Sequence, residues 1–240
     1  MKNFKKDFDV VLSMIDSGYH FSISRYGDGE MVVMDGKKID ITRKANGEFR
    51  YDPEVKKDEE SRQMLIDSFK YRSDNYFVGI GCRCCVGDNN FMKMKDLSGQ
   101  YEENLTWANI FVNSNYEHVK NDLIPLLSKK KVVMVAHAMA DISGLPFDVV
   151  KTFRCLPNAF TRSIELVDEI KDWIKDNDVK DHVFVMCAGP LACILAHKLH
   201  EFNKENTYID FGSGLDVMMS LGKTRGYLAG DHYLTKTCVW

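Results

Sequence analysis

Apolar residues recur at two different spacings along the chain, and the spacing distinguishes helices from strands. Residues 4–17 carry a helical stripe that ends at Gly18, the residue type usual just after a helix. In the second half, short continuous apolar runs, typical of strands buried on both faces, alternate with amphipathic stretches. This order predicts an α/β, Rossmann-like fold, with a mostly parallel sheet and helices on both of its faces. We expect strands at 19–25, 76–81, 131–136, 152–156, 182–187 and 207–210, and helices at 4–17, 54–71, 116–128, 161–175 and 190–203.

The stretches between these predicted helices and strands contain turns and irregular segments, but none has the composition of a linker between domains. Residues 87–104 are polar and predict an irregular segment, and Asn46-Gly47 predicts a turn. The proline at position 125 predicts a break in the helix over 116–128, because proline lacks the N–H that a helix interior needs. We find no internal repeat or low-complexity tract. The simplest organisation is a single domain over 1–240, with insertions in its N-terminal half.

Composition narrows the class of protein. Apolar residues make up 45% of the sequence and charged residues 28%, as in ordinary soluble proteins. Lysine and arginine total 32 against 35 aspartates and glutamates, a net charge of −3 that argues against a protein coating nucleic acid. No apolar run approaches the roughly 20 residues of a membrane span, and the N-terminus lacks the apolar core of a signal peptide. We therefore expect a cytoplasmic protein with no nucleic-acid partner and no membrane span.

The acidic pair Asp28 and Glu30 is the most informative local feature. Both lie in the segment Arg-Tyr-Gly-Asp-Gly-Glu, which starts at Arg25 and follows a predicted strand, and Gly27 and Gly29 give its backbone freedom. Open α/β sheets bind ligands at the ends of their strands. Carboxylate oxygens suit Mg²⁺ and Mn²⁺, which bridge proteins to phosphate. A surface turn in which Asp28 caps the next helix explains the same residues, and the local pattern does not separate the two.

Two glycine turns follow strands later in the chain. Gly189 and Pro190 follow the strand at 182–187 and open a helix, whose free N–H groups attract phosphate. The spacing matches neither GxGxxG nor GxxxxGK[ST], so tight packing of helix on strand explains these two residues equally well. The second turn follows the strand at 207–210 and runs over Asp210–Asp216, with two carboxylates, a hydroxyl and two glycines.

This second turn also has a local interpretation. Ser213 is expected to cap a short helix over 215–221, and a ligand site can coexist with such a cap. The polar segment Gly222–Tyr227 contains Arg225 and Tyr227, which could contact a diphosphate or a sugar. We expect instead that this segment is solvated.

Histidines and cysteines give weaker signals. His137 ends a predicted strand and is the best placed of the seven histidines for chemistry. Cys82, Cys84 and Cys85 are close in sequence, but no second ligand pair stands at a spacing typical of zinc sites. We therefore interpret these three cysteines as packing residues at a strand end.

Three motifs, taken in order, resemble those of the GT-D-fold glycosyltransferases. Arg25–Glu30 resembles the RxGDGE signature of that family. Cys155–Phe160 resembles its mid-chain cP-x-NAf element. Ala188–Ala192, followed by Tyr208–Ser213, resembles its C-terminal GPxA and DxG elements. The order and separations match as well, and together the motifs cover most of the chain.

The resemblance implies a nucleotide-sugar-dependent glycosyltransferase. Asp28 and Glu30 would hold Mn²⁺ or Mg²⁺ on the donor diphosphate, which makes Glu30 a catalytic residue as well as a metal ligand. Several relatives have a histidine where this chain has Ser213, so the resemblance does not identify the catalytic base. The reaction needs a carboxylate or histidine near the acceptor hydroxyl, and Asp216 is the candidate. The expected partners are a nucleotide-sugar donor and a glycan or other glycoconjugate acceptor, with a homodimer left open. Donor binding would fall to Arg25, Gly27, Gly29, Asn158, Gly189, Pro190, Asp210, Gly212 and Ser213.

Two other functions fit the same residues. A non-catalytic nucleotide- or sugar-binding module would bind its ligand without transfer and without a strict need for metal. A phosphoester hydrolase acting through the acid pair would release product with no acceptor present. Two adjacent carboxylates near phosphate favour the enzyme over the binding module, which has less use for them.

Overall fold

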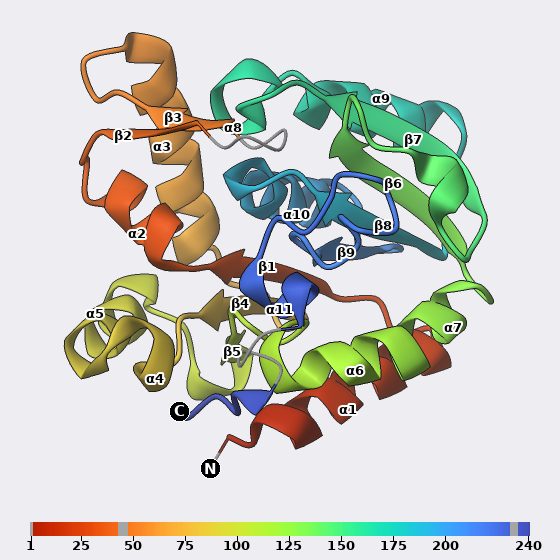
Figure 1. The fold of residues 1–240 in the computed structure, drawn as a ribbon. Coiled ribbons are helices and arrows are strands. Elements are labelled where there is room, and N and C mark those ends of the chain that lie inside the picture. The colour runs from red at the N-terminus through yellow and green to blue at the C-terminus, as the bar shows by residue number, and fades with distance from the viewer. Residues whose placement is uncertain (1, 43–47, 231–234) are drawn as a thin grey trace.

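The computed structural model describes residues 2–42, 48–230 and 235–240, so the predicted turn at Asn46-Gly47 lies outside the described residues. A parallel sheet of seven strands, in the order β5-β4-β1-β9-β8-β6-β7, runs through the molecule (Figure 1). Two further strands, β2 and β3, form a separate antiparallel pair. The strands are β1 (Ser22–Tyr26), β2 (Ile39–Thr42), β3 (Glu48–Tyr51), β4 (Tyr76–Ile80), β5 (Leu105–Trp107), β6 (Lys131–His137), β7 (Val149–Cys155), β8 (His182–Cys187) and β9 (Thr207–Asp210).

Helices cover both faces of the sheet, because its central strands are apolar on both sides. In β6, Val133 and Val135 face one buried cluster, which includes α3 (Lys56–Lys70), α9 (Leu166–Asp176) and α10 (Pro190–Phe202). Val132 and Met134 face the other cluster, which includes α1 (Phe4–Ser17) and α7 (Ile124–Leu127). Figure 1 shows these two groups above and below the sheet. The predicted fold class is therefore confirmed. The helices are α1 (Phe4–Ser17), α2 (Asp28–Met34), α3 (Lys56–Lys70), α4 (Arg83–Val86), α5 (Asp88–Ser98), α6 (Tyr116–His118), α7 (Ile124–Leu127), α8 (Ala159–Arg162), α9 (Leu166–Asp176), α10 (Pro190–Phe202) and α11 (Gly226–Ala229).

Two of the predicted irregularities are wrong. Residues 88–98 form the helix α5 between Gly87 and Gly99, and the few apolar side chains that it buries, such as Phe91, are enough to anchor it. The chain also stays helical through Pro125. A π-helical turn over Val119–Leu123 joins α6 to α7, and Pro125 then falls in the first turn of α7, where its missing N–H costs nothing.

The segment after β9 differs from its prediction as well. Residues 212–220 form turns instead of a helix over 215–221, so Ser213 caps no helix. Its hydroxyl forms a hydrogen bond of 2.8 Å with that of Tyr227, which is buried against Tyr116. The expectation of a solvated segment over 222–227 therefore fails at Tyr227.

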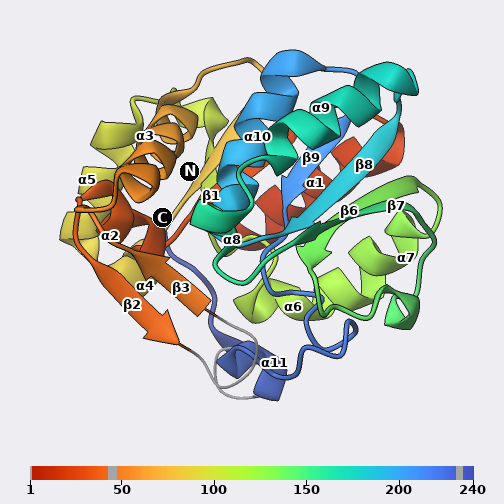
Figure 2. The same ribbon diagram turned by 90° about the horizontal axis from the view of Figure 1, so that it is seen from above.

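The elements next to the carboxyl ends of the strands come from distant parts of the chain. Figure 2 shows the β2–β3 pair, in orange, on the same side of the molecule as α11, in blue. No helix in the described ranges combines the length and apolarity needed to cross a lipid bilayer.

Candidate functional site

Two hollows open where the parallel strands end, and they meet at the acid pair. The first has a volume of about 340 Å³ and is lined by the exits of β6, β7 and β8. The second has a volume of about 480 Å³ and is lined by the exits of β1, β4 and β9. Because ligands of open α/β sheets bind at this edge, we treat the two hollows as one strand-end groove. The residues that line both hollows are Asp28, Glu30, Gly189 and Arg225.

The acid pair sits in the first turn of α2, directly after β1. Gly27 is the N-cap, Asp28 is the first helical residue, and Glu30 Oε2 accepts the Gly27 N–H at 2.8 Å. Burial raises the pKa of Glu30, although this hydrogen bond opposes the shift. The cap interpretation of the sequence is thus met by Glu30 and not by Asp28, and it leaves both residues in the groove.

The free oxygens of this pair fit a hard divalent cation. Asp28 is exposed, and its Oδ1 accepts the N–H of Gly29 at 3.0 Å. The hydrogen bonds that this pair accepts from other described residues use Glu30 Oε2 and not Oε1, and the one that Asp28 accepts from Gly29 uses Oδ1, which leaves Asp28 Oδ2 and Glu30 Oε1 for a cation. Two carboxylate oxygens, completed by water and phosphate oxygens, are the kind of donor set that Mg²⁺ and Mn²⁺ take.

Arg25 and Asp210 line the second hollow, but their polar atoms bind each other. The Arg25 backbone N–H and Nη2 donate to the two Asp210 carboxylate oxygens at 3.1 and 3.2 Å. Arg25 Nε donates to the Asp210 carbonyl at 2.6 Å, and Nη1 donates to the carbonyl of Ala108 at 2.8 Å. Both side chains are almost fully buried. The pair therefore holds the exits of β1 and β9 together, beneath the groove surface.

Gly212 packs against this ion pair. Its φ of 66° lies in the left-handed region, and a Cβ atom placed there would collide with Arg25 Nη2. We expect Gly212→Ala to lower the free energy of unfolding by about 2–4 kcal/mol, from backbone strain and the collision together, measured by urea denaturation.

A matched control separates the collision from backbone strain. Gly222 has a φ of 82°, and a Cβ atom there would meet open space. Gly222→Ala therefore carries only the left-handed strain of about 1–2 kcal/mol. An equal loss in the two variants would contradict the role of Gly212 in seating Arg25.

Asn158 joins the β2–β3 pair to the first hollow. It has a left-handed backbone, with φ of 55°, which asparagine tolerates better than most residues. Its Oδ1 accepts the N–H of Arg50 in β3 at 3.0 Å, and its Nδ2 donates to Thr161 Oγ1 at 2.8 Å. The side chain lines the first hollow while fixing the position of β3.

The N-terminus of α10 lies where the two hollows meet, because its N-cap Gly189 lines both. Gly189, with φ of 57° and ψ of −144°, is the N-cap, and Pro190 opens a helix of 13 residues. That backbone conformation is essentially restricted to glycine. Free N–H groups at the start of a helix of this length favour an anion such as phosphate, close to Asp28 and Glu30.

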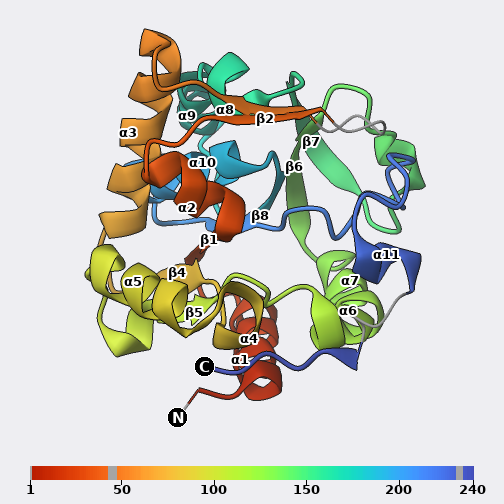
Figure 3. The ribbon, with the colours of Figure 1, turned by 60° about the vertical axis from the view of Figure 1, so that its left-hand side comes forward.

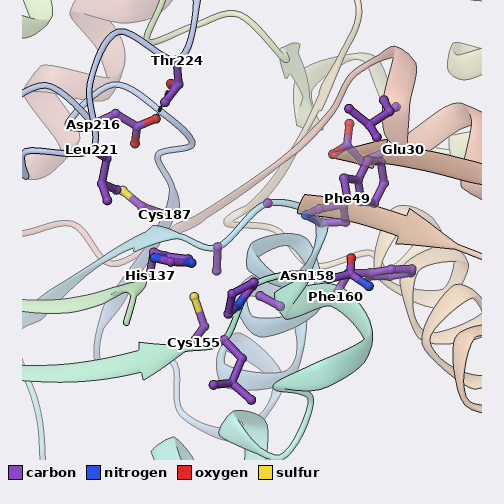
Figure 4. Close-up of a pocket in the computed structure, with 18 of the residues that line it drawn as sticks. Glu30, Phe49, His137, Cys155, Asn158, Phe160, Cys187, Asp216, Leu221 and Thr224 are labelled. Carbon is purple, nitrogen blue, oxygen red and sulfur yellow. Dashed lines mark hydrogen bonds between the residues drawn. The ribbon is translucent and has the colours of Figure 1, made fainter. Parts of the chain in front are cut away.

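Asp216 and His137 lie in the first hollow, across from the acid pair. Figure 4 shows Asp216 with Thr224 on one side and Glu30 with Phe49 on the other. Burial raises the pKa of Asp216 to about 6, although the Thr224 hydroxyl donates a hydrogen bond to it. A carboxylate with this pKa is suited to take a proton near neutral pH.

His137 is arranged as a hydrogen-bond donor. Its Nδ1 accepts the N–H of Met139 at 3.2 Å, so the neutral ring carries its proton on Nε2. Burial lowers the pKa of His137, which keeps the ring neutral. Its Nε2 is buried and has no partner among the described residues. Asp216 is therefore the better base and His137 the better donor.

Arg225 is a groove residue that the sequence placed in a solvated tail. Among the described residues it is the one lysine or arginine that lines both hollows. Its side chain is exposed, and its Nη1 donates to the adjacent Thr224 carbonyl at 3.3 Å. In the sequence, the sign of a binding role for Arg225 is its position between Gly222 and Gly226 in a polar segment. That pattern is equally typical of a surface loop.

Comparison with known proteins identifies the fold. The sequence matches no protein-family model and no curated protein. One solved structure of similar fold, described as "Selenomethionine substituted structure of domain of unknown function 1792 (DUF1792)", has a TM-score of 0.56 at 21% identity and aligns over 85% of this chain and 76% of that chain. Another has a TM-score of 0.59 at 20% identity and aligns over 94% of this chain and 82% of that chain. Its description reads "The highly conserved domain of unknown function 1792 has a distinct glycosyltransferase fold". This chain therefore has the fold of the DUF1792 domains, a fold described as that of a glycosyltransferase.

Proposed function

We propose that this protein is a metal-dependent glycosyltransferase that moves a sugar from a nucleotide-sugar donor to a hydroxyl group of a glycan or other acceptor. The observation that carries this proposal is one groove, at the strand ends of a glycosyltransferase-type fold, that holds the acid pair, a helix N-terminus and Asp216. The acid pair and the helix N-terminus suit a diphosphate. Asp216 suits an acceptor hydroxyl.

The donor side of the reaction needs charge neutralisation. When the bond between sugar and diphosphate breaks, negative charge develops on the leaving phosphate, and fixed positive dipoles stabilise it. Gly189 and Pro190 begin α10 there, so the positive end of the helix dipole faces the diphosphate, and Arg225 adds a guanidinium. Asp28 and Glu30 would hold Mn²⁺ or Mg²⁺, which supplies further positive charge to the diphosphate.

The acceptor side needs a base. As the acceptor oxygen bonds to the sugar carbon, its proton must leave, and Asp216 is the carboxylate placed to take it. The Thr224 hydroxyl orients Asp216 by donating to its Oδ2. His137 lines the same hollow and contributes a neutral ring to its wall. These roles assign the first hollow to the sugar and the acceptor.

Arg225 gives a binding prediction. We expect Arg225→Ala to raise the Kd of the donor about ten- to a hundredfold, because a charge-assisted hydrogen bond to phosphate is worth about 1.5–3 kcal/mol. Arg225→Lys should recover only part of the loss, since lysine cannot form a bidentate contact. Isothermal titration of the donor and of the free nucleoside diphosphate measures both variants. An unchanged Kd for both ligands would remove Arg225 from the diphosphate site.

A ligand screen tests the proposal as a whole. Nucleotide sugars are screened by thermal unfolding with and without Mn²⁺, and donor present at 100 times its Kd should stabilise the fold by about 2.7 kcal/mol. We expect stabilisation by a nucleotide sugar to require the cation, and transfer to require an acceptor. Binding that ignores Mn²⁺ and leads to no transfer would contradict the proposal in favour of a binding module. Rapid product release without an acceptor would contradict it in favour of a hydrolase.

A further inference from the structure

Four cysteines from two distant parts of the chain meet beside the second hollow. Their sulfur atoms all lie within 4.8 Å of one another, and we call Cys82, Cys84, Cys85 and Cys238 the four-cysteine cluster. The first three lie at the start of α4, and the fourth lies in the C-terminal segment 235–240. Figure 3 shows this segment running past α4 to the C-terminus. No second ligand pair lies near the first three cysteines in the sequence, and the fold brings Cys238 to them from the C-terminal segment.

The spacing of the sulfur atoms matches a tetrahedral metal site. With Zn–S bonds of about 2.3 Å, neighbouring sulfur atoms in a tetrahedron lie about 3.8 Å apart. The sulfur atoms of Cys82 and Cys84 are 3.3 Å apart, and the others lie within the 4.8 Å limit, so small side-chain rotations bring all four to that distance. Thiol groups are weak hydrogen-bond donors and acceptors, which gives them little reason to gather on their own.

The surroundings of the cluster offer donors toward sulfur. Asn109 Nδ2 lies 3.2 Å from Cys85 Sγ and within hydrogen-bond range of two other sulfur atoms of the cluster. Asn113 Nδ2 lies 3.5 Å from Cys238 Sγ, and Asn113 holds this position with a left-handed φ of 56°. Such N–H groups stabilise thiolates and orient them on a metal. Lys236 Nζ, 3.1 Å from the Cys84 carbonyl, places a positive charge beside the cluster.

The C-terminal segment is held by contacts with other elements and not by regular secondary structure. Residues 236–240 have no regular secondary structure. Trp240 packs edge-on against Trp107 and Phe91, and the Arg83 N–H donates to the Val239 carbonyl at 3.1 Å. A cross-link at Cys238 would fix this segment to α4. It would also brace the second hollow, because Cys85, Asn109 and Asn113 line that hollow.

We propose that the four-cysteine cluster binds one zinc ion as a structural tetrathiolate site that fixes the C-terminal segment to α4 and braces one wall of the strand-end groove. Four sulfur ligands in a closed tetrahedron are typical of structural zinc, whereas Mg²⁺ and Mn²⁺ prefer oxygen. Each thiol loses its proton to solvent as its sulfur bonds the metal. The site differs from the acid pair in its residues and in its ligand chemistry, so it does not depend on the proposed function.

Metal content tests this site directly. We expect protein purified without chelators to contain one zinc ion per chain, measured by inductively coupled plasma mass spectrometry. The double variant Cys82→Ser with Cys238→Ser should lose it. Cys155→Ser and Cys187→Ser are matched controls outside the cluster and should keep it. Zinc-free wild-type protein, or a double variant that retains a full equivalent of zinc, would overturn the proposal.

Two measurements on the wild-type protein keep the test decisive if the double variant does not fold. Replacement of zinc by Co²⁺ should give the intense visible absorption of a tetrahedral tetrathiolate. Titration of the denatured protein without reductant should find all seven cysteines as thiols. Fewer than seven thiols, together with no Co²⁺ spectrum, would assign the cluster to disulfides and overturn the zinc site. Removal of the zinc should lower the Tm, and its return should restore it.

Discussion

Replacing Glu30 with glutamine is expected to reduce sugar transfer by about 10³-fold or more, since a bound cation contributes several kcal/mol to the stabilisation of a leaving diphosphate. The fold should survive. The glutamine carbonyl can still accept the Gly27 N–H, so the cap of α2 is kept. Burial raises the pKa of Glu30, which means that ionising this side chain costs stability and that a neutral amide is well tolerated. Initial rates at saturating donor and Mn²⁺, with Tm measured in parallel, check both parts.

Asp28→Asn should have a similar effect on activity through the same cation. The matched control is Asp35→Asn, which makes the same change at the other end of α2, where Asp35 pairs with Lys93 away from the groove. We expect Asp35→Asn to keep its rate and to lose at most about 1 kcal/mol of stability. Full activity in both Glu30→Gln and Asp28→Asn would show that the acid pair has no part in the mechanism. That conclusion would hold even if the wild-type enzyme needed a metal ion.

The strands and longer helices could be predicted from sequence because their signals are local. The strands at His182–Cys187 and Thr207–Asp210 were predicted with the observed limits. Each is a short apolar run, and such runs need no information from elsewhere. The helix α5 was missed because it buries only one face beneath a mostly polar sequence. The helix over 116–127 tolerates Pro125 through a π-helical turn, which depends on packing that the sequence pattern does not contain.

The candidate site was harder to predict because its members are joined by contacts across the whole chain. Arg25 and Asp210 are separated by 185 residues, and only the fold shows that they are engaged with each other. Asn158 likewise binds the backbone of β3 across 108 residues. The sequence selected residues of suitable chemistry at strand ends, and parallel strands necessarily gather those ends at one edge. The sequence pattern does not distinguish residues that face the groove, such as Asp28, from residues that pack beneath its surface, such as Arg25 and Asp210.

Replacing Asp216 with asparagine should reduce transfer by about 10²–10⁴-fold, the usual contribution of a positioned general base. In the wild type, kcat/KM should fall as the pH drops below about 6, because protonated Asp216 cannot take the acceptor proton. The variant should retain a low rate without this dependence. Burial lowers the pKa of His137 from its ordinary value, which favours its neutral form. A wild-type profile that is flat between pH 5 and 7 would exclude Asp216 as the base (these limits span about one unit on either side of its pKa).

The same variant should be more stable than the wild type at neutral pH. The pKa of Asp216 is about 6 in the folded state and near 3.8 when unfolded, so the folded state holds the proton more tightly. Its contribution to stability is therefore complete below pH 3.8 and is lost as the pH rises to about 6. A neutral amide escapes that loss and can still accept the Thr224 hydroxyl, so we expect Asp216→Asn to gain about 1–3 kcal/mol at neutral pH by urea denaturation. Asp172→Asn, on the exposed face of α9, should gain nothing. A residue retained only for packing would lose stability on replacement, whereas one retained for proton transfer should show this combination of slower turnover and a more stable fold.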